Sequence, residues 1–277
     1  MTKNTPLQID EILAEMGEAG KLLHQMGASE GGAGNVSVCM RAPLNVDRLF
    51  SLKERIRLPV NAPALAGMML IASGSGCRLR DIHKKPAGTL GCVFVEEGGK
   101  HGLLLTAEER QFTKLTSEFN SHLAVHNHRM ASESGLTFHA VLHAQPPHIT
   151  YLSHIERYQD EDYFNRHLLR WEPETILQFP QGFGVTRYQM PGSMEITKVT
   201  LEAMKDHVIT IWSKHGVVTR SDISLMQAFD RIEYAEAAAH FEYLNLTLGE
   251  PSSGLSSAEI LEICGRHHIQ QHVFQHD

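Results

Sequence analysis

The segment VLHAQPPHITYLSH, residues 141–154, contains side chains that could bind a metal ion. On a β-strand, side chains i and i+2 lie on the same face, so a metal-binding strand commonly carries a His-x-His pair. His143 occupies the first of these positions, but Gln145 occupies the second. His148 follows two prolines, after which strand alternation no longer predicts where a side chain points. The segment is therefore compatible with a metal site, with a modified metal site, or with a strand that carries incidental histidines.

His215 is a second candidate ligand, far from the first in the chain. The run VITIW, residues 208–212, predicts a buried strand, and Lys214-His215-Gly216 follows at its end. Functional side chains often converge where strands end in loops at the edge of a sheet. A lone histidine in such a place usually makes a structural hydrogen bond, so His215 becomes a candidate ligand only in combination with His143.

Glu118, His122 and His126 recur every four residues in a predicted helix, so they share one face. This row could hold a metal ion, although such a stripe is more often the polar side of a helix. Glu118 also lies in the first helical turn, where a carboxylate complements the helix dipole. The residue types alone do not decide between an acid/base role and a helix-start role for Glu118.

Two glycine-rich loops, GGAGNVS at residues 31–37 and ASGSG at residues 72–76, lie at the ends of predicted strands. Glycine lets backbone N–H groups approach an anion, and Asn35, Ser73 and Ser75 add side-chain donors. Neither loop matches a P-loop or a dinucleotide fingerprint. Together with the small polar pair Thr116-Ser117, they suggest a phosphate cradle in which backbone dipoles supply much of the attraction.

Apolar periodicity predicts helices interleaved with strands. It predicts an amphipathic helix from Ile9 to Met26, which Gly27 ends. Residues 91–97 and 101–106 are apolar runs separated by Gly-Gly, which predicts a hairpin. Further strands are predicted at residues 34–40, 68–76, 139–145, 175–179, 184–189 and 208–212, and further helices after residues 116–117, 191–193 and 221–222. These elements indicate an α/β layered domain with a mixed or antiparallel sheet.

Composition and charge argue against several classes of protein. The chain has 277 residues, of which 42% are hydrophobic and 21% charged, as in an ordinary soluble globular protein. Its net charge is -7 and no run of Lys and Arg is longer than a pair, so nucleic acid is not an expected partner. The most apolar stretch, residues 58–72, is broken by prolines and is too short to span a membrane.

The N-terminal segment and the cysteines indicate the cellular compartment. The N-terminal segment turns acidic where a secretory signal would be apolar, so we expect a cytoplasmic protein. Four scattered cysteines without a C-x-x-C pair fit reduced thiols. We expect a single domain over residues 1–277, with a short helical tail from about residue 250.

The order of the motifs resembles that of a known family. The chain carries AGNVS, ASGSG, TSE, VLHAQPPHITYL, QFPQGFGV and IWSKHGVV in succession. This succession resembles the class II aldolase/adducin family over roughly residues 8 to 249. The resemblance implies a three-layer α/β/α fold around a central, largely antiparallel sheet. It also implies a homotetramer with the active site near a subunit interface.

The resemblance also implies roles for particular residues. The family binds Zn²⁺ through a His-x-His pair and a later His-Gly histidine, which correspond here to His143, Gln145 and His215. The acid/base glutamate of the family corresponds to Glu118. Its phosphate-binding loops correspond to Gly34, Asn35, Ser75, Gly76, Thr116 and Ser117. Trp171-Glu172 lies in a stretch that could contact the aldehyde half of a substrate.

The implied reaction is the cleavage of a phosphorylated sugar, a ketose 1-phosphate of the L-rhamnulose type, into dihydroxyacetone phosphate and a hydroxyaldehyde such as L-lactaldehyde. Breaking the C3–C4 bond leaves charge on the carbonyl and adjacent hydroxyl oxygens. Zn²⁺ or another divalent transition metal that chelates both oxygens stabilises that charge as a Lewis acid. A carboxylate beside the metal can move the proton on the enediolate carbon.

Gln145 departs from the family pattern. An amide oxygen is a neutral and poorer donor to Zn²⁺ than an imidazole, so the metal affinity or preference should differ. Three alternatives follow: Gln145 is a weak ligand, His148 replaces it, or the metal site is degraded. The function has alternatives too, because the same fold hosts phosphosugar epimerases and dehydratases as well as non-catalytic relatives.

Overall fold

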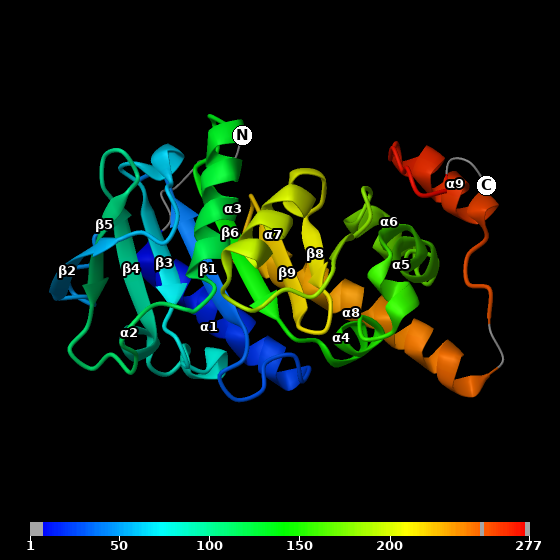
Figure 1. Ribbon diagram of the computed structural model, residues 1–277, viewed down its shortest axis with the longest axis horizontal. Helices are drawn as coiled ribbons and strands as arrows, with labels where there is room; N and C mark the ends of the chain where they lie inside the picture. Colours follow the sequence, from blue (N-terminus) through cyan, green and yellow to red (C-terminus); the bar gives the residue numbers. More distant parts are fainter. Residues whose placement is uncertain (1–7, 250–251, 275–277) are drawn as a thin grey trace.

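The computed structural model describes residues 8–249 and 252–274, and in these residues the chain forms one nine-stranded sheet in the order β2-β5-β4-β3-β1-β6-β9-β8-β7 (Figure 1). The strands are β1 (Asn35–Met40), β2 (Leu52–Arg57), β3 (Met69–Ser73), β4 (Leu90–Val95), β5 (His101–Thr106), β6 (Phe138–Ala144), β7 (Gly184–Thr186), β8 (Ile209–Trp212) and β9 (Gly216–Ser221). Every pairing is antiparallel except that of β7 with β8. The predicted hairpin is the β4–β5 pair, and the predicted largely antiparallel sheet is confirmed.

Helices cover both faces of the sheet. They are α1 (Ile9–Gln25), α2 (Pro86–Thr89), α3 (Phe119–Ser132), α4 (Pro147–Leu152), α5 (Glu161–Leu168), α6 (Pro173–Gln178), α7 (Met194–Asp206), α8 (Leu225–Leu248) and α9 (Ser257–His267). Three short 3-10 turns, η1 (Pro63–Leu65), η2 (Leu79–Asp81) and η3 (Glu156–Gln159), lie between them. In Figure 1, α3 and α7 lie on one face and α1 and α8 on the other. This arrangement confirms the predicted α/β/α layers.

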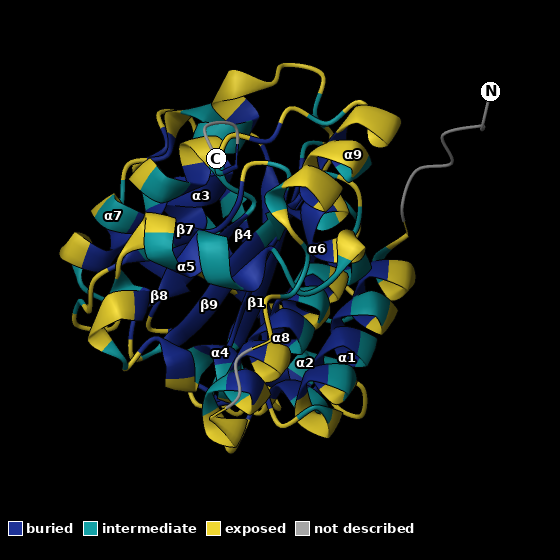
Figure 2. Ribbon diagram, turned by 90° about the vertical axis from the view of Figure 1, so that its right-hand side faces the viewer, coloured by how far each residue is buried: buried dark blue, intermediate teal, exposed yellow. Residues whose placement is uncertain are grey.

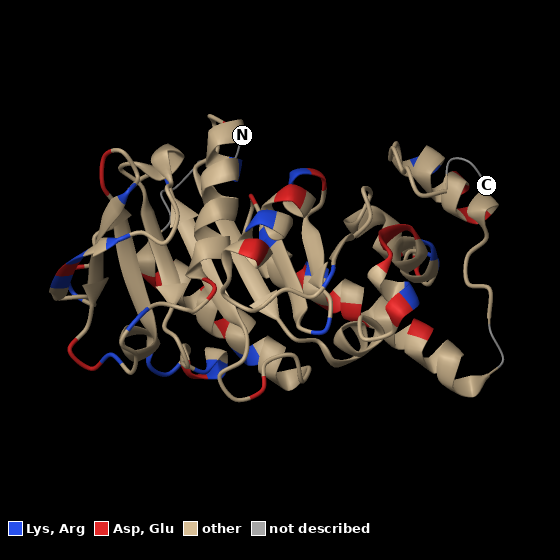
Figure 3. Ribbon diagram, viewed as in Figure 1, with Lys and Arg blue, Asp and Glu red and all other residues tan. Residues whose placement is uncertain are grey.

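The central strands are buried on both sides and carry no charge. All residues of β1, β3 and β6 are buried, and none of them is Lys, Arg, Asp or Glu, so these strands are tan in Figure 3. Figure 2 shows β1 and its neighbours in the sheet in dark blue beneath helices whose outer sides are exposed. The edge strand β2 (LKERIR) is mostly exposed and charged, which protects an edge from pairing with other chains. Because it lacks an apolar face, β2 was not predicted from the sequence.

Residues 175–179 were predicted as a strand, and this prediction was wrong. They lie largely in α6, which begins with Pro173. Proline at the first helical position has the right φ and lacks an N–H that the helix would leave unpaired. The Thr175 hydroxyl donates to the carbonyl oxygens of Leu169 and Glu172 at 2.9 and 2.6 Å. A short apolar run does not distinguish a strand from a helix by its periodicity.

The helix starts were predicted within a few residues. As expected, α7 is capped by Ser193, whose Oγ accepts the Ile196 N–H at 3.2 Å. The cap of α8 is Ser224 rather than residue 221 or 222. The cap position of α3 is Glu118 itself, and its N–H donates to Thr116 Oγ1 at 3.3 Å. Thr116 and Ser117 therefore precede the helix and remain in the loop.

The cysteines and the C-terminal tail were also subjects of prediction from the sequence. All four cysteines are buried free thiols, as predicted. The helical tail is α9, which packs against α6, but residues 250 and 251 of the predicted connection lie outside the described residues. No helix in the described part of the chain combines the length and hydrophobicity needed to cross a bilayer.

We predict that Gly34→Ala destabilises the protein more than Gly27→Ala does. Both glycines have positive φ, +79° and +75°, so alanine costs about 1–2 kcal/mol at either position. A Cβ on Gly34 would also lie 2.9 Å from the carbonyl oxygen of His143, whereas a Cβ on Gly27 would meet nothing within 4 Å. Urea unfolding measures both free energies. Equal losses would contradict a tight β1–β6 approach at this point.

Candidate active site

Three segments bring one carboxylate and two imidazoles together. Glu118 precedes α3, His143 lies on β6, and His215 lies in the turn between β8 and β9. Glu118 Oε2 is 3.6 Å from His143 Nε2, and Glu118 Oε1 is 3.4 Å from His215 Nε2. One ligand atom from each residue lies within 4.8 Å of the others. This spacing fits a group that could hold one metal ion.

The two imidazoles are oriented by their surroundings. His143 Nδ1 lies 2.8 Å from the carbonyl oxygen of Val217, which can only accept, so Nδ1 carries the proton. The other ring nitrogen, Nε2, therefore faces the carboxylate, the arrangement found in many metal-binding histidines. The indole of Trp212 packs against both rings, at 4.8 Å from His143 and 5.2 Å from His215.

Glu118 is a buried carboxylate that stays ionised. Burial by itself would raise the pKa of the Glu118 carboxyl, but nearby His143 and a hydrogen bond from Asn35 outweigh it, so the pKa lies below its ordinary value. Asn35 Nδ2 donates to Glu118 Oε2 at 2.7 Å. Burial, reinforced by the neighbouring His143, lowers the pKa of His215 to about 4. At neutral pH the cluster thus contains a carboxylate and an uncharged His215, which suits a divalent transition metal.

One cavity of about 170 Å³ is lined by all the residues that the sequence resemblance assigned to the metal, the acid/base and the phosphate. Its lining includes the cluster of three, Gln145, and the loop residues Gly34, Asn35, Ser75, Gly76, Thr116 and Ser117. The two glycine-rich loops and the segment before α3 therefore meet around the carboxylate. The side-chain amide of Asn35 also donates to Glu118 Oε2, a contact that the sequence analysis did not predict.

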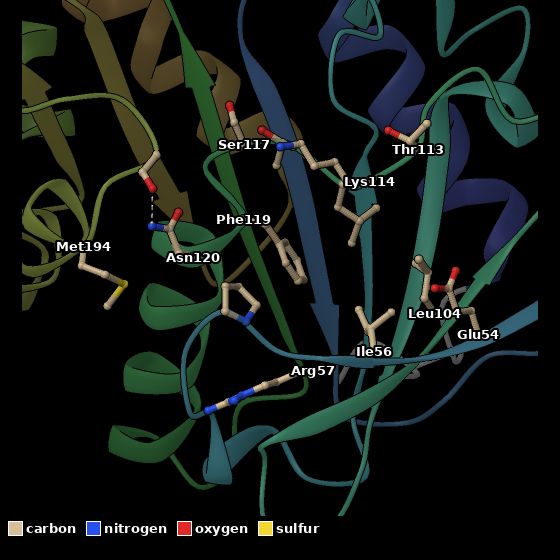
Figure 4. A pocket seen from close by; sticks show the side chains of 14 residues that line it. Glu54, Ile56, Arg57, Leu104, Thr113, Lys114, Ser117, Phe119, Asn120 and Met194 are labelled. Atoms are coloured by element: carbon tan, nitrogen blue, oxygen red, sulfur yellow. Dashed lines mark hydrogen bonds between the residues drawn. The ribbon is translucent and has the colours of Figure 1, made fainter.

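Pro191 also lines this cavity, although the sequence analysis assigned that segment only to a helix start. Asn120 of α3 donates to the carbonyl oxygen of Gly192 at 3.0 Å, the dashed line in Figure 4, and so fixes this loop beside the site. The sequence signal that could have indicated this loop is the proline and glycine directly before the capping serine of α7. They mark a loop that leads into the N-terminus of α7.

A larger cavity of about 560 Å³ adjoins the first, and Thr116 and Ser117 line both. Figure 4 shows Arg57, Lys114 and Phe119 around it. Its lining contains no histidine, and its one carboxylate, Glu54, lies on the exposed edge strand β2. The candidate chemistry therefore belongs to the smaller cavity.

Gln145 and His148 point to different places. Gln145 lines the small cavity together with His143 and His215. His148 does not line it: its Nδ1 lies 2.7 Å from Glu236 Oε1, and its ring stacks on His240 at 4.2 Å. The Glu236 carboxylate also accepts the backbone N–H groups of His148 and Ile149, both at 3.0 Å. His148 is thus fixed against α8, which argues against its replacing Gln145 as a ligand.

The row Glu118, His122 and His126 does not form a common metal site. His122 Nδ1 and His126 Nε2 each lie 2.7 Å from the hydroxyl of Ser37, and His126 Nδ1 lies 2.6 Å from His139 Nδ1. Among the described residues, the group that could hold a metal contains only Glu118 from this row. The two histidines contact the sheet instead.

Trp171 and Glu172 lie away from the cavity. Trp171 Nε1 donates to the buried carboxylate of Glu242 at 2.8 Å, and its ring stacks on Phe241. Neither Trp171 nor Glu172 lines either of the two cavities described above. Within this chain, their expected contact with a substrate aldehyde has no support.

Comparison with known proteins decides the family. Residues 14–243 match the family model described as the class II aldolase and adducin N-terminal domain. The chain belongs to this family. Membership confirms the sequence resemblance and supports aldolase chemistry, that is a carbon–carbon lyase, at the level of the family.

Individual class II aldolases resemble the chain over most of its length. It is 26% identical to rhamnulose-1-phosphate aldolase of Bacteroides thetaiotaomicron, covering 94% of this chain and 95% of that protein. The identity to rhamnulose-1-phosphate aldolase of Enterococcus faecalis is 29%, covering 90% and 88%. The crystal structure of a sugar-phosphate aldolase from Thermotoga maritima superposes with a TM-score of 0.75 at 27% identity, covering 89% and 99%.

We predict that acid destabilises the protein through its buried histidines. Burial lowers the pKa of His122 to about 3 and those of His126 and His139 well below the ordinary 6.5. Below about pH 6.5 the unfolded chain therefore binds more protons than the folded protein, so the free energy of unfolding decreases as the pH falls. As the pH falls from about 7.5 to about 5.5, these three residues should lower the free energy of unfolding by about 4 kcal/mol, or about 1.4 kcal/mol each.

Urea unfolding over a pH series checks this prediction. His126→Gln should reduce the slope below the ordinary pKa by about 1.4 kcal/mol per pH unit, since one proton fewer is taken up on unfolding. His83 is exposed, so His83→Gln serves as the control and should leave the slope unchanged. Stability that stays flat over the acid range would show that the three imidazoles are not neutral in the folded protein.

Proposed function

We propose that this protein is a metal-dependent aldolase that cleaves a ketose 1-phosphate of the L-rhamnulose type to dihydroxyacetone phosphate and a hydroxyaldehyde such as L-lactaldehyde. One observation carries the proposal. Glu118, His143 and His215, from three distant segments, meet in a cavity that is also lined by the glycine- and serine-rich loops. A site that combines metal ligands with anion-binding loops suits a phosphorylated substrate whose carbonyl must be polarised.

The loops supply donors for the phosphate group. The backbone N–H groups of Ser75 and Thr116 already donate to the carbonyl oxygens of Lys114 and Ser73, both at 2.9 Å. We therefore assign the phosphate to the hydroxyls of Ser75 and Ser117 and to the backbone of Gly76 and Gly34. Both glycines have positive φ, which turns the backbone where a side chain would be strained.

His143 and His215 would hold the metal ion, and Gln145 would add a weak oxygen ligand or leave its position to water. When bound, the ion supplies Lewis-acid polarisation of the substrate carbonyl. Zinc or another divalent transition metal is our proposal for its identity, because imidazole ligands match the preferences of these ions. From the family resemblance we also propose a single domain and a homotetramer.

Glu118 would act as the acid/base. Its carboxylate is ionised and its Oε2 is held by the Asn35 amide, so in condensation it can accept a proton from the carbon of dihydroxyacetone phosphate next to the carbonyl. In cleavage, the protonated side chain would return a proton to the same carbon of the enediolate. The same two-way transfer allows cleavage and condensation. The phosphate contacts would fix the substrate so that this carbon stays beside the carboxylate.

We predict that Glu118→Gln lowers kcat about 10³-fold while leaving the fold intact, because the amide keeps the shape but cannot take up a proton. The assay couples dihydroxyacetone phosphate formation to a reporter enzyme, with a panel of ketose 1-phosphates and with zinc, cobalt or manganese supplied. Product identity by mass spectrometry or NMR distinguishes cleavage from epimerisation or dehydration. Absence of dihydroxyacetone phosphate from every substrate with wild-type protein would refute the proposal.

We predict that His143→Ala and His215→Ala each weaken metal binding by more than about 100-fold, beyond the effect typical of changes outside the ligand shell. His148→Ala is the matched control and should keep the metal, because His148 contacts Glu236 and His240 instead. Gln145→His should strengthen zinc binding. Elemental analysis and competition with a chelating dye measure these affinities. Loss of metal from the His148 variant comparable to that from the His143 variant would reverse the assignment.

A further inference from the structure

A row of buried polar side chains joins α3 to the sheet below the candidate site. We call it the histidine seam: His122, Ser37, His126 and His139. All four side chains have 0% exposure. The Ser37 hydroxyl contacts both helix histidines at 2.7 Å, and His126 contacts His139 at 2.6 Å. The seam has no part in the proposed chemistry, so its role needs another explanation.

The seam connects the segments that carry the site. His122 and His126 follow Glu118 by four and eight residues in the chain. Ser37 lies on β1, two residues after Asn35, and His139 lies on β6, four residues before His143. The two strands pair with Asn35 opposite His143 and Cys39 opposite His139. Each hydrogen bond of the seam therefore links the helix behind Glu118 to the strands that bear its partners.

Hydrogen bonds fix the register of this packing more strictly than apolar contacts do. Burial keeps the three imidazoles neutral, so each has one donor and one acceptor nitrogen. The hydrogen bonds that join these rings through one hydroxyl therefore need a consistent order of donors and acceptors. A shift of the helix along the sheet would break several of these bonds at once. Hydrophobic contacts are non-directional and tolerate such a shift better.

The ends of α3 show why such a device matters. No side chain caps the N-terminus of α3, where Glu118 lies. The distal half is fixed by Arg129, which makes a paired ion contact with Asp222 at 2.7 to 3.1 Å. Between these points, the seam supplies the polar contacts from α3 to β1 and β6.

We propose that Ser37, His126 and His139 are positioning residues that set the place of Glu118 relative to His143. They act through the helix and the strands and do not touch the substrate. The consequence for catalysis rests on the proposed function, whereas the consequence for the geometry of Glu118 and His143 does not. Loss of the seam would let α3 move, which changes the 3.6 Å separation between these two side chains.

Ser37→Ala tests the proposal, because it removes both hydroxyl contacts of the seam. Ser121→Ala is the matched control on the same helix: the Ser121 hydroxyl contacts Thr197 Oγ1 of α7 at 3.1 Å and not the sheet. We expect Ser37→Ala to lower kcat about 10- to 100-fold, as misplacement by about 1 Å can, with KM nearly unchanged. Ser121→Ala should keep kcat, and Ser37→Thr, which restores a hydroxyl, should recover most of the loss.

Melting temperatures and crystal structures of both alanine variants complete the test. A longer separation between Glu118 and His143 in Ser37→Ala, with the wild-type separation in Ser121→Ala, supports the proposal even when no substrate is cleaved by the wild type. In that case the proposed function fails and the positioning role stands. An unchanged separation in Ser37→Ala, or equal losses of kcat in both variants at similar melting temperatures, would overturn the positioning role.

Discussion

The site depends on keeping the Glu118 carboxylate ionised in the interior of the protein. A buried carboxylate is unstable unless hydrogen bonds and opposite charge offset its lost hydration. The Asn35 amide provides the hydrogen bond, and the imidazoles of His143 and His215, at 3.6 and 3.4 Å, further lower the pKa of the carboxyl. These residues come from β1, β6 and the β8–β9 turn. The neighbouring positions of β1, β6, β9 and β8 in the sheet thus bring these partners together around one side chain.

The absence of charge on the central strands has a consequence for binding. In the proposed site, glycine-rich loops and hydroxyl groups would supply the attraction for an anion in the small cavity, while Arg57 and Lys114 line the neighbouring cavity. Backbone dipoles can bind a phosphate without a cation close to the metal ligands, where a fixed positive charge would oppose a bound metal ion. This division suits a site that has to hold an anion and a cation a short distance apart.

Gln145 lines the cavity at the position where the sequence resemblance led us to expect a metal-binding histidine. The histidine that could have replaced it, His148, is held by Glu236, which also accepts two backbone N–H groups at the start of α4. Turning His148 toward the cavity would leave this buried carboxylate with fewer partners. The structure therefore leaves the position beside His143 and His215 to an amide.

The sequence by itself determined most of the strands and the long helices, an α/β layered domain with a mixed or antiparallel sheet, and the segments that line the cavity, but not the edge strand β2. This was possible because glycine, proline and capping serine affect the backbone locally, and because the periodicities of strands and helices can be recognised in the sequence. The same local information was ambiguous for residues 175–179, where a short apolar run became α6.

Tertiary structure decided what each polar side chain contacts. His148 lies away from the cavity because Glu236, 88 residues later in the chain, accepts hydrogen bonds from its ring Nδ1 and its backbone N–H. His122 and His126 looked like ligands on a helix face, but Ser37 and His139 on neighbouring strands pair with them. Asn35, which the sequence placed only in a phosphate loop, also donates its side-chain amide N–H to Glu118. Hydrogen-bond partners of buried groups come from whichever segment the fold brings near, and spacing along the chain does not encode that choice.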